Sequence, residues 1–541
     1  MLLSNVLSGG FGASIRLDEL PHALGIYALA LVAGVPLGAV GAHSMRRYGL
    51  HWSWAGVATC CALLLHGAIA GWGTLAVVAS ISALVRGRRR HREEITAGQD
   101  LAQSARSRHS PTDLIVAVFN EWRLRIRMHT LGPRCWYQAD RLVLGRAAYG
   151  RLVTIPFGGR HGGTHTLLVG ATGSGKTVTQ TWIAARGIER GMGAVVVDPK
   201  GDRAMRAVLA RMAARCGREF IEWTPTGPRA YNPFARGSDS EVADKVLAGE
   251  RFTEPHYLRQ AQRFLGHAVR ALRANHIQTS LQAIARTLDP EQLELLARDM
   301  PESAARGTYE YLDSLTPRQL GDIAGVRDRL AILAESDVAP WLENREGEGA
   351  CFDLLEAARD RAVVYFDLDA DRRPLLTQML GAAIVQDLQT TVASLQSQPI
   401  PTVVVIDEFS ALATEQVVRL FGRARSAAFS LVLGTQELSD LRLPGRPALA
   451  EQVLGNLAVV VAHRQVVPAS AELICSLAGS RGAWRTSHLD HRISRTRIRE
   501  NVLQVEEVMN LAPGCAAAVV FAEGGGTEIV RVFAEPREVH Q

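Results

Sequence analysis

The chain has 541 residues, a hydrophobic content of 47% and a formal net charge of +6 at pH 7. This length exceeds one ordinary hydrophobic core, so we expect two or three domains. The seven cysteines form no Cys-x-x-Cys pair, which argues against a structural metal site or a disulfide framework and favours reduced thiols. The basic balance favours nucleic acid or acidic lipid as a partner.

Two apolar stretches open the chain. Residues 24–42 carry no charge, and residues 55–85 contain His66 as their one ionisable group. Because a membrane-spanning helix needs about 20 residues, we expect each stretch to cross a membrane once, the second as one long or tilted helix. Acidic residues in the leader argue against a cleaved signal peptide. We therefore predict a membrane anchor over residues 1–92.

Arginines on the flanks of these stretches predict their orientation. Arg46 and Arg47 lie between them, and the run RGRRRHR at residues 86–92 contributes five more. The positive-inside rule places this run, and the body after it, in the cytoplasm. Two crossings would leave the N-terminus on the same side, in a multi-pass protein of the inner membrane. The run could also be a nucleic-acid patch, but its position favours contact with acidic lipid.

Residues 170–177, GATGSGKT, match the phosphate-binding pattern G-x-x-x-x-G-K-[ST]. They follow the apolar run HTLLV and precede a helix-like segment, which is the context this pattern requires. Lys176 is expected to reach the β- and γ-phosphates, and the Thr177 hydroxyl to bind Mg²⁺. The predicted nucleotide-binding residues are Gly170, Ala171, Thr172, Gly173, Ser174, Gly175, Lys176, Thr177 and Val178.

Continuous β-branched runs predict an α/β fold built on central parallel strands. These runs lie at residues 193–202, 362–369, 401–409, 430–436 and 456–464. Helix-like spacing replaces them over residues 236–345, which indicates an inserted all-helical domain. The nucleotide-binding domain would then comprise residues 93–235 and 346–541.

The run PTVVVIDEF places Asp407 and Glu408 at the end of an apolar strand, where carboxylates face the phosphate crevice of an α/β sheet. Asp407 is predicted to hold Mg²⁺, and Glu408 to be the base that polarises the attacking water. Gln436 ends the next strand and could contact the γ-phosphate. Arg423 and Arg425 precede it, and either could stabilise phosphoryl charge or simply be a solvated helix residue.

Other nucleotide-binding classes fit the sequence less well. A transporter signature LSGG occurs at residues 7–10, but it precedes the phosphate loop instead of following it. A guanine-specific Asn-Lys-x-Asp motif is absent from the sequence. A small-molecule kinase would not need two membrane spans.

The ordered set HTLLVGATGSGKT, VVVDPKGD, YNPF, VVVIDEFSAL, GRARSAAFSLVLGTQELSDL and GNLAVVVAHR resembles the type IV secretion coupling proteins of the TraG/TraD kind. The resemblance implies a RecA-like P-loop motor domain with an inserted all-helical domain, two preceding transmembrane helices and a homo-hexameric ring. It also implies ATP and Mg²⁺ as cofactors, and delivery of single-stranded DNA with its bound relaxase to the components of a secretion channel.

Three further expectations follow from the resemblance or qualify it. The family has an arginine before its glutamine at a distance similar to that between Arg425 and Gln436. The resemblance therefore implies that Arg425 is an arginine finger acting across subunits. The segment at residues 481–500 packs six arginines and either lines the DNA path or is a polar linker. The alternatives are an FtsK/HerA-like translocase of double-stranded DNA and a membrane scaffold that binds ATP without moving DNA.

Overall fold

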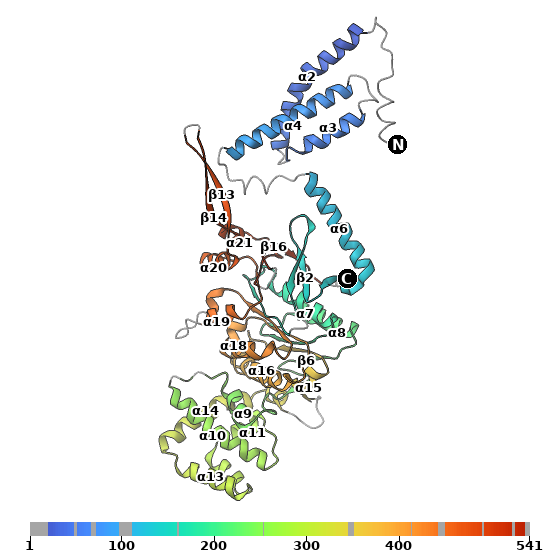
Figure 1. Ribbon diagram of the computed structural model, residues 1–541. Coiled ribbons are helices and arrows are strands. Elements are labelled where there is room, and N and C mark those ends of the chain that lie inside the picture. The colour runs from blue at the N-terminus through green and yellow to red at the C-terminus, as the bar shows by residue number, and fades with distance from the viewer. Residues whose placement is uncertain are drawn as a thin grey trace. The chain divides into compact units, whose positions relative to one another are not determined.

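The computed structural model describes residues 20–47, 51–65, 72–96, 111–158, 162–250, 252, 254–343, 351–412, 414–441, 449–489, 492–521 and 525–535 (Figure 1). The chain forms two compact units. The N-terminal unit comprises residues 1–127, 149–151 and 480–500, and the sheet unit comprises residues 128–148, 152–479 and 501–541.

The sheet unit is built on a mixed sheet that contains twelve strands within the described residues. Seven neighbouring strands are parallel, in the order β12 (Val459–Ala462), β4 (Thr166–Val169), β11 (Phe429–Thr435), β10 (Thr402–Ile406), β5 (Gly193–Asp198), β9 (Val363–Asp367) and β6 (Phe220–Trp223). Antiparallel strands extend the sheet beyond β12, namely β15 (Cys515–Val520), β16 (Thr527–Val532), β2 (Arg141–Arg146), β3 (Leu152–Pro156) and β1 (Tyr137–Gln138). Each of the five runs predicted as parallel strands coincides with one of the seven parallel strands, namely β5, β9, β10, β11 or β12.

Both faces of the central strands are buried, which explains their continuous apolar runs. Along β10, Val404 and Ile406 join one hydrophobic core, and Val403 and Val405 join the other. Helices α7 (Lys176–Glu189) and α8 (Arg203–Arg215) cover the second face, and α16 (Pro374–Leu395) and α18 (Thr414–Ala424) cover the first. The result is a three-layer α/β/α arrangement.

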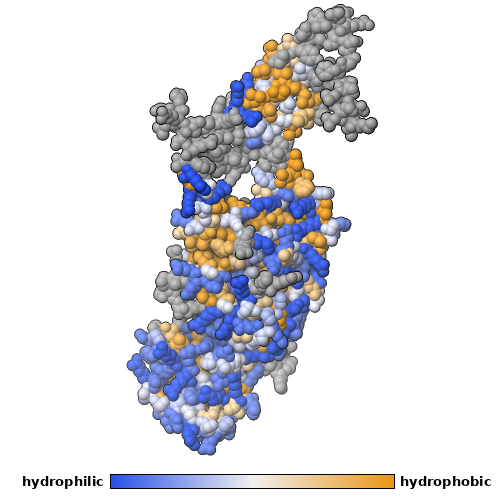
Figure 2. Space-filling view, in the orientation of Figure 1, coloured by the Kyte–Doolittle hydropathy of each residue, from blue (hydrophilic) through white to orange (hydrophobic). Residues whose placement is uncertain are grey.

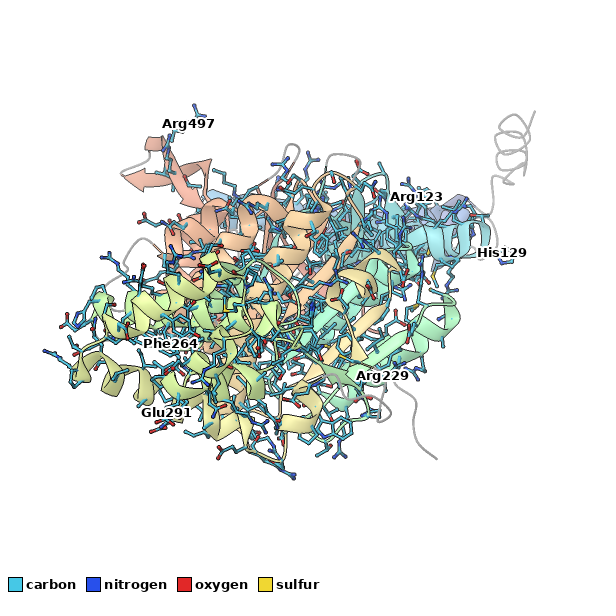
Figure 3. All side chains as sticks on the ribbon, turned by 90° about the horizontal axis from the view of Figure 1, so that it is seen from below. Arg123, His129, Arg229, Phe264, Glu291 and Arg497 are labelled. Atoms are coloured by element: carbon cyan, nitrogen blue, oxygen red, sulfur yellow. The ribbon has the colours of Figure 1, made fainter. Side chains whose placement is uncertain are left out.

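A helical stretch lies between β7 (Ala230–Tyr231) and β8 (Cys351–Phe352), which pair in parallel at its base. Its elements are α9 (Asp239–Leu247), α10 (Pro255–Ala274), α11 (Leu281–Thr287), α12 (Pro290–Ala297), α13 (Glu302–Asp313), α14 (Pro317–Ala334) and the short η3 (Ala339–Leu342). Phe264 of α10 and Glu291 of α12 mark this helical stretch in Figure 3. The domain limits predicted at residues 236 and 345 stay a prediction.

A buried ion pair joins this helical stretch to the sheet layers. Lys245 of α9 donates to Asp387 of α16 at 2.6 Å and to two backbone carbonyls, those of Pro233 and Arg236. The Tyr231 hydroxyl donates to the other oxygen of Asp387 at 2.8 Å. Since each charged atom has hydrogen-bond partners, the buried pair is satisfied.

Short elements complete the sheet unit. They are η1 (Gly132–Trp136), α15 (Leu354–Arg359), α17 (Phe409–Leu412), η4 (Leu438–Leu441), α19 (Leu449–Gly455), α20 (Pro468–Ala478) and α21 (Val505–Met509). The turn η2 (Ala148–Gly150) spans the boundary between the units.

The N-terminal unit corrects one prediction. Helix α2 (Leu20–Arg47) contains the first apolar stretch, and its segment Ala28–Met45 is the one window in the described residues long and apolar enough to cross a membrane. The second stretch is not one helix, because it divides into α3 (Trp54–Leu65) and α4 (Trp72–Thr96). At 1.5 Å per residue, α3 is about 18 Å long, short of a hydrocarbon core of about 30 Å. Two transmembrane helices are therefore not confirmed.

Glycines set the direction in which these helices pack. A Cβ at Gly34 would lie 2.7 Å from Val78, and one at Gly38 would lie 2.6 Å from Ser82. Because the contact advances along both helices together, α2 and α4 are parallel. A Cβ at Gly87 of α4 would lie 2.7 Å from Trp52, just before α3, so α3 runs antiparallel to α4. This close packing at small residues is typical of membrane helix pairs.

The arginine-rich segment forms a two-stranded ribbon of β13 (Ser480–Leu489) and β14 (Arg492–Asn501). Whether this ribbon lines the DNA path or is a polar linker stays a prediction. Arg497 and Arg499 are exposed, and the Arg497 guanidinium lies beside Gly482 of the facing strand. Figure 3 shows Arg497 on this ribbon.

Candidate nucleotide-binding site

The phosphate loop connects β4 to α7, as the motif predicts. Gly175 is the N-cap of α7 and has a φ of 107°, a left-handed conformation that favours glycine. Gly170 makes a close approach, since a Cβ there would lie 2.6 Å from the Cβ of His463. The backbone N–H groups of Gly170 and Ala171 donate to the carbonyls of Thr435 and Arg464, which ties the loop to the neighbouring strands.

Asp407 and Glu408 follow β10, whose carboxyl end lies on the same edge of the sheet as the loop. Strand β11 separates β10 from β4. Gly434 of β11 has no side chain, which leaves room beside Asp407, since a Cβ there would lie 2.5 Å from Asp407 Oδ1. The Gln180 side chain of α7 passes over this glycine and donates to Asp407 at 3.1 Å.

Lys176 joins the loop to this carboxylate pair. Its Nζ lies 3.3 Å from Glu408 Oε2 and 3.6 Å from Asp407 Oδ1, and its side chain is 9% exposed. The structure therefore brings together the predicted phosphate anchor, the predicted Mg²⁺ ligand and the predicted base.

A second lysine, which the sequence did not reveal as a site residue, contacts the same carboxylate. The Nζ of Lys200 donates to Glu408 Oε2 at 2.9 Å. The turn after β5 positions it: Asp198 accepts the backbone N–H of Lys200 and of Asp202, and Asp202 caps α8. Gly201 has a φ of 70°, and a Cβ there would meet the carboxylate of Asp367. In the DPKGD motif, then, the other residues shape the turn and Lys200 extends from it.

Glu408 is strained and remains ionised. Its φ of 45° is unusual for a residue with a side chain. Burial raises the pKa of the Glu408 carboxyl, but the hydrogen bond from Lys200 and the charges of Lys176 and Lys200 outweigh burial, so the pKa is lowered. The Gln436 side chain also lowers the pKa of Glu408, which places Gln436 near this carboxylate.

His463 contacts the phosphate loop and the helix α7 that follows it. Its Nδ1 lies 3.1 Å from the carbonyl of Cys515, and its Nε2 lies 2.9 Å from the Thr179 hydroxyl of α7. Burial lowers its pKa to about 4, so the ring is neutral at pH 7. With a carbonyl facing Nδ1, that nitrogen carries the proton and Nε2 accepts from Thr179. Only its place directly after β12 could have signalled this role.

Arg423 and Arg425 lie elsewhere. Arg423 is near the end of α18, Arg425 follows it before β11, and both are exposed. Seven residues of β11 separate them from Gln436, a distance of about 23 Å at 3.3 Å per residue. The structure therefore does not bring Arg425 to the phosphate loop of its own chain.

The residues present fit a nucleotide with a divalent cation. The Ser174 hydroxyl of the loop is buried and lacks a hydrogen-bond partner within the described residues. Thr177 lies in the first turn of α7. No group of three or more His, Cys, Asp or Glu side chains that could hold a metal ion occurs in the part of the chain that the structure describes. A cation here would therefore use Thr177, Asp407 and oxygens of the nucleotide.

A phosphate loop at the carboxyl end of β4, with acidic residues after β10 and β11 between the two strands, defines a P-loop NTPase fold of the RecA-like kind. Comparison with known proteins agrees. Over residues 150–502 the chain matches the family described as the type IV secretion-system coupling protein DNA-binding domain. The chain belongs to this family.

Individual relatives are more distant. The type 4 coupling protein DotL of Legionella pneumophila is 33% identical over 100 residues, which cover 16% of this chain and 13% of that relative's length. The conjugative coupling protein TrwBdeltaN70 aligns over 76% of this chain and 92% of its own, with a TM-score of 0.58 and 18% identity. TrwB in complex with ADP and Mg²⁺ aligns over 70% of this chain and 87% of its own, with a TM-score of 0.54 and 20% identity. At identities this low, the comparison shows that this chain has the same fold as TrwB.

Proposed function

We propose that this chain is a membrane-anchored ATPase that couples ATP hydrolysis to the transfer of DNA to a type IV secretion channel. Family membership supports the class of protein. The observation that carries the enzymatic part is the convergence of Lys176 and Lys200 on Glu408, beside the phosphate loop. A site that only bound nucleotide would not need an ionised carboxylate held by two cations at a strand end.

The side chains take distinct parts in this proposal. Lys176 leaves the carboxylates for the phosphates when nucleotide binds, and Lys200 keeps Glu408 in place and ionised. Glu408 accepts the proton of the attacking water, and Gln436 orients that water or senses the γ-phosphate. Mg²⁺, held by Thr177 and Asp407, would neutralise charge on the phosphate oxygens. The solved structures of TrwB with ADP and Mg²⁺, and with a non-hydrolysable ATP analogue, support these cofactors.

Assembly and substrate follow the family. A homo-hexameric ring would place nucleotide between neighbours, and Arg425, remote from its own site, would act on the next subunit. The transported substrate is single-stranded DNA with its relaxase. The exposed Arg497 and Arg499 of the ribbon support contacts with DNA phosphates.

The packing of α2 and α4 changes the expected orientation in the inner membrane. Because the two helices are parallel, Arg46 and Arg47 at the end of α2 lie at the same end of the bundle as the run at residues 86–92. The positive-inside rule then places both arginine groups in the cytoplasm. The start of α2 lies on the opposite side from the catalytic body, whether α3 and α4 cross the bilayer or dip into it and return.

ATP turnover by the full chain in detergent or vesicles tests the function. We expect hydrolysis that rises with single-stranded DNA. A larger rise with double-stranded DNA would support an FtsK/HerA-like translocase instead, and bound ATP without turnover, with or without DNA, would support a scaffold.

A further inference from the structure

One face of helix α6 (Pro111–Leu131) packs against a turn of the chain. Its Asn120 side chain donates to the carbonyl of Tyr149 at 2.9 Å, and Leu124 is 3% exposed. A Cβ at Gly150 would lie 3.5 Å from Asn120, in ordinary contact. Because these residues all belong to the N-terminal unit, one face of α6 is fixed against the 149–150 turn.

The opposite face of α6 is apolar and exposed. Its side chains are Ile115, Val118, Phe119, Trp122 and Ile126, with exposures of 67, 62, 55, 58 and 41%. At about 100° per residue these positions form one stripe about 100° wide. The rings of Phe119 and Trp122 lie 6.2 Å apart. Hydrophobic residues gather over the N-terminal part of α6 in Figure 2.

Cationic side chains border the stripe on both sides. On the helical wheel Arg123 falls about 80° to one side of Ile115 and Arg125 about 80° to the other. The Arg125 side chain is 77% exposed, and its contact with Glu121 at 3.5 Å leaves the guanidinium in solvent. Arg123 is also exposed; its position is labelled in Figure 3. In this position the methylene groups of an arginine can lie along an apolar surface while its guanidinium reaches anionic groups at the border of that surface.

The size and position of the stripe favour a lipid surface over a protein partner. The five side chains expose on the order of 500 Å², enough to mark an interaction site. A standard protein interface buries about 800 Å² on each partner, more than this stripe exposes. The helix also follows α4, whose end carries the basic run at residues 86–92.

We propose that α6 lies in the plane of the membrane, with its apolar stripe at the boundary between the headgroups and acyl chains of an anionic bilayer. Phe119 and Trp122 enter the acyl region, and Arg123 and Arg125 contact lipid phosphates. This inference rests on the membrane anchoring in the proposed function. It adds a second membrane contact, close to the start of the sheet unit.

Photocrosslinking on the full chain tests the proposal. A benzophenone amino acid replaces Phe119 or Trp122 in protein reconstituted in vesicles of phosphatidylethanolamine and phosphatidylglycerol. We expect lipid adducts by mass spectrometry at both positions. The matched control is the same probe at Glu121, which lies on the same helix about 120° from Ile115 and outside the stripe, and it should give several-fold less adduct.

Charge dependence provides a second measurement. In the chain probed at position 119, Arg123→Gln with Arg125→Gln should lower the lipid adduct several-fold, as should vesicles of phosphatidylcholine alone. Equal adduct in all these cases would contradict the part assigned to the arginines.

Three other outcomes overturn the proposal in different ways. Covalent dimers at 119 and 122 without lipid adducts would show that the stripe contacts a second copy of the chain. A chain removed from vesicles by alkaline carbonate would refute the anchoring itself. A chain retained by vesicles, but without adducts at either position, would refute only the placement of α6.

Discussion

Replacing Lys200 by methionine would remove one of the two cations that hold Glu408, with little change in side-chain length. A hydrogen bond to a charged group contributes about 1.5–3 kcal/mol. Because the Lys200 side chain is 48% exposed, solvent screening reduces this to about 1 kcal/mol. That energy corresponds to a shift of about 0.7 pKa unit, or about fivefold in rate.

The sign of the effect is fixed by the contact. Lys200 stabilises the carboxylate form of Glu408 and lowers its pKa, so Lys200→Met should raise that pKa. If Glu408 is the base, activity falls as the pH drops through its pKa. The acidic limb of kcat against pH should therefore move to higher pH by about 0.7 unit, so that kcat at a fixed pH on this limb falls about fivefold while nucleotide binding is retained.

Steady-state ATP turnover between about pH 3 and pH 8, a range that extends below the ordinary pKa of a glutamate, measures the shift. Lys200→Arg should keep the limb close to its original position. Arg203→Gln, which removes an exposed charge from the nearby start of α8, should leave it unchanged. An unmoved limb in Lys200→Met, with the melting temperature preserved, would refute the role assigned to Lys200.

The remaining predictions concern catalysis, assembly, DNA and topology. Glu408→Gln should bind ATP, measured by a fluorescent analogue, but lose about 10²-fold or more in turnover, and full turnover would exclude it as the base. Arg425→Ala should lose about 10³-fold in turnover and recover part of it in rings mixed with Lys176→Ala, and rings that demonstrably mix without recovery would place the finger elsewhere. Log affinity for single-stranded DNA should fall against log salt by about 0.7 per phosphate contacted, and a slope unchanged by Arg497→Gln with Arg499→Gln would remove the ribbon from the DNA contact. A protease-cleavable tag at the N-terminus should be cut by protease added to intact spheroplasts, and the same tag in the loop after α2 should be protected. The reverse pattern would support the two-span orientation predicted from sequence.

Local patterns predicted the parts of the site that one segment of chain determines. The apolar runs before Asp407 and Gln436 marked strands that are buried on both faces, and the motif around Lys176 required a loop between a strand and a helix. Strand β15, CAAAVV, has few β-branched residues, and it forms because β12 and β16 pair with it.

Contacts between distant segments could not be predicted. Lys200 meets Glu408 across 208 residues, and His463 meets Thr179 across 284. Neither pair has a spacing that a single sequence can reveal. The division of the second apolar stretch was also missed, because hydropathy measures the length of an apolar run and not whether the helix is continuous.

The ion pair between Lys245 and Asp387 has a mechanical consequence. The helical stretch is not attached by a flexible tether: its first helix is bonded to α16, and its helices share one hydrophobic core with a face of the sheet. Helix α16 packs in turn against α17 and α18, which follow Glu408 in the chain. A force applied to the outer end of the helical stretch is therefore transmitted through a rigid connection at its base to the helices that follow Glu408 in the chain.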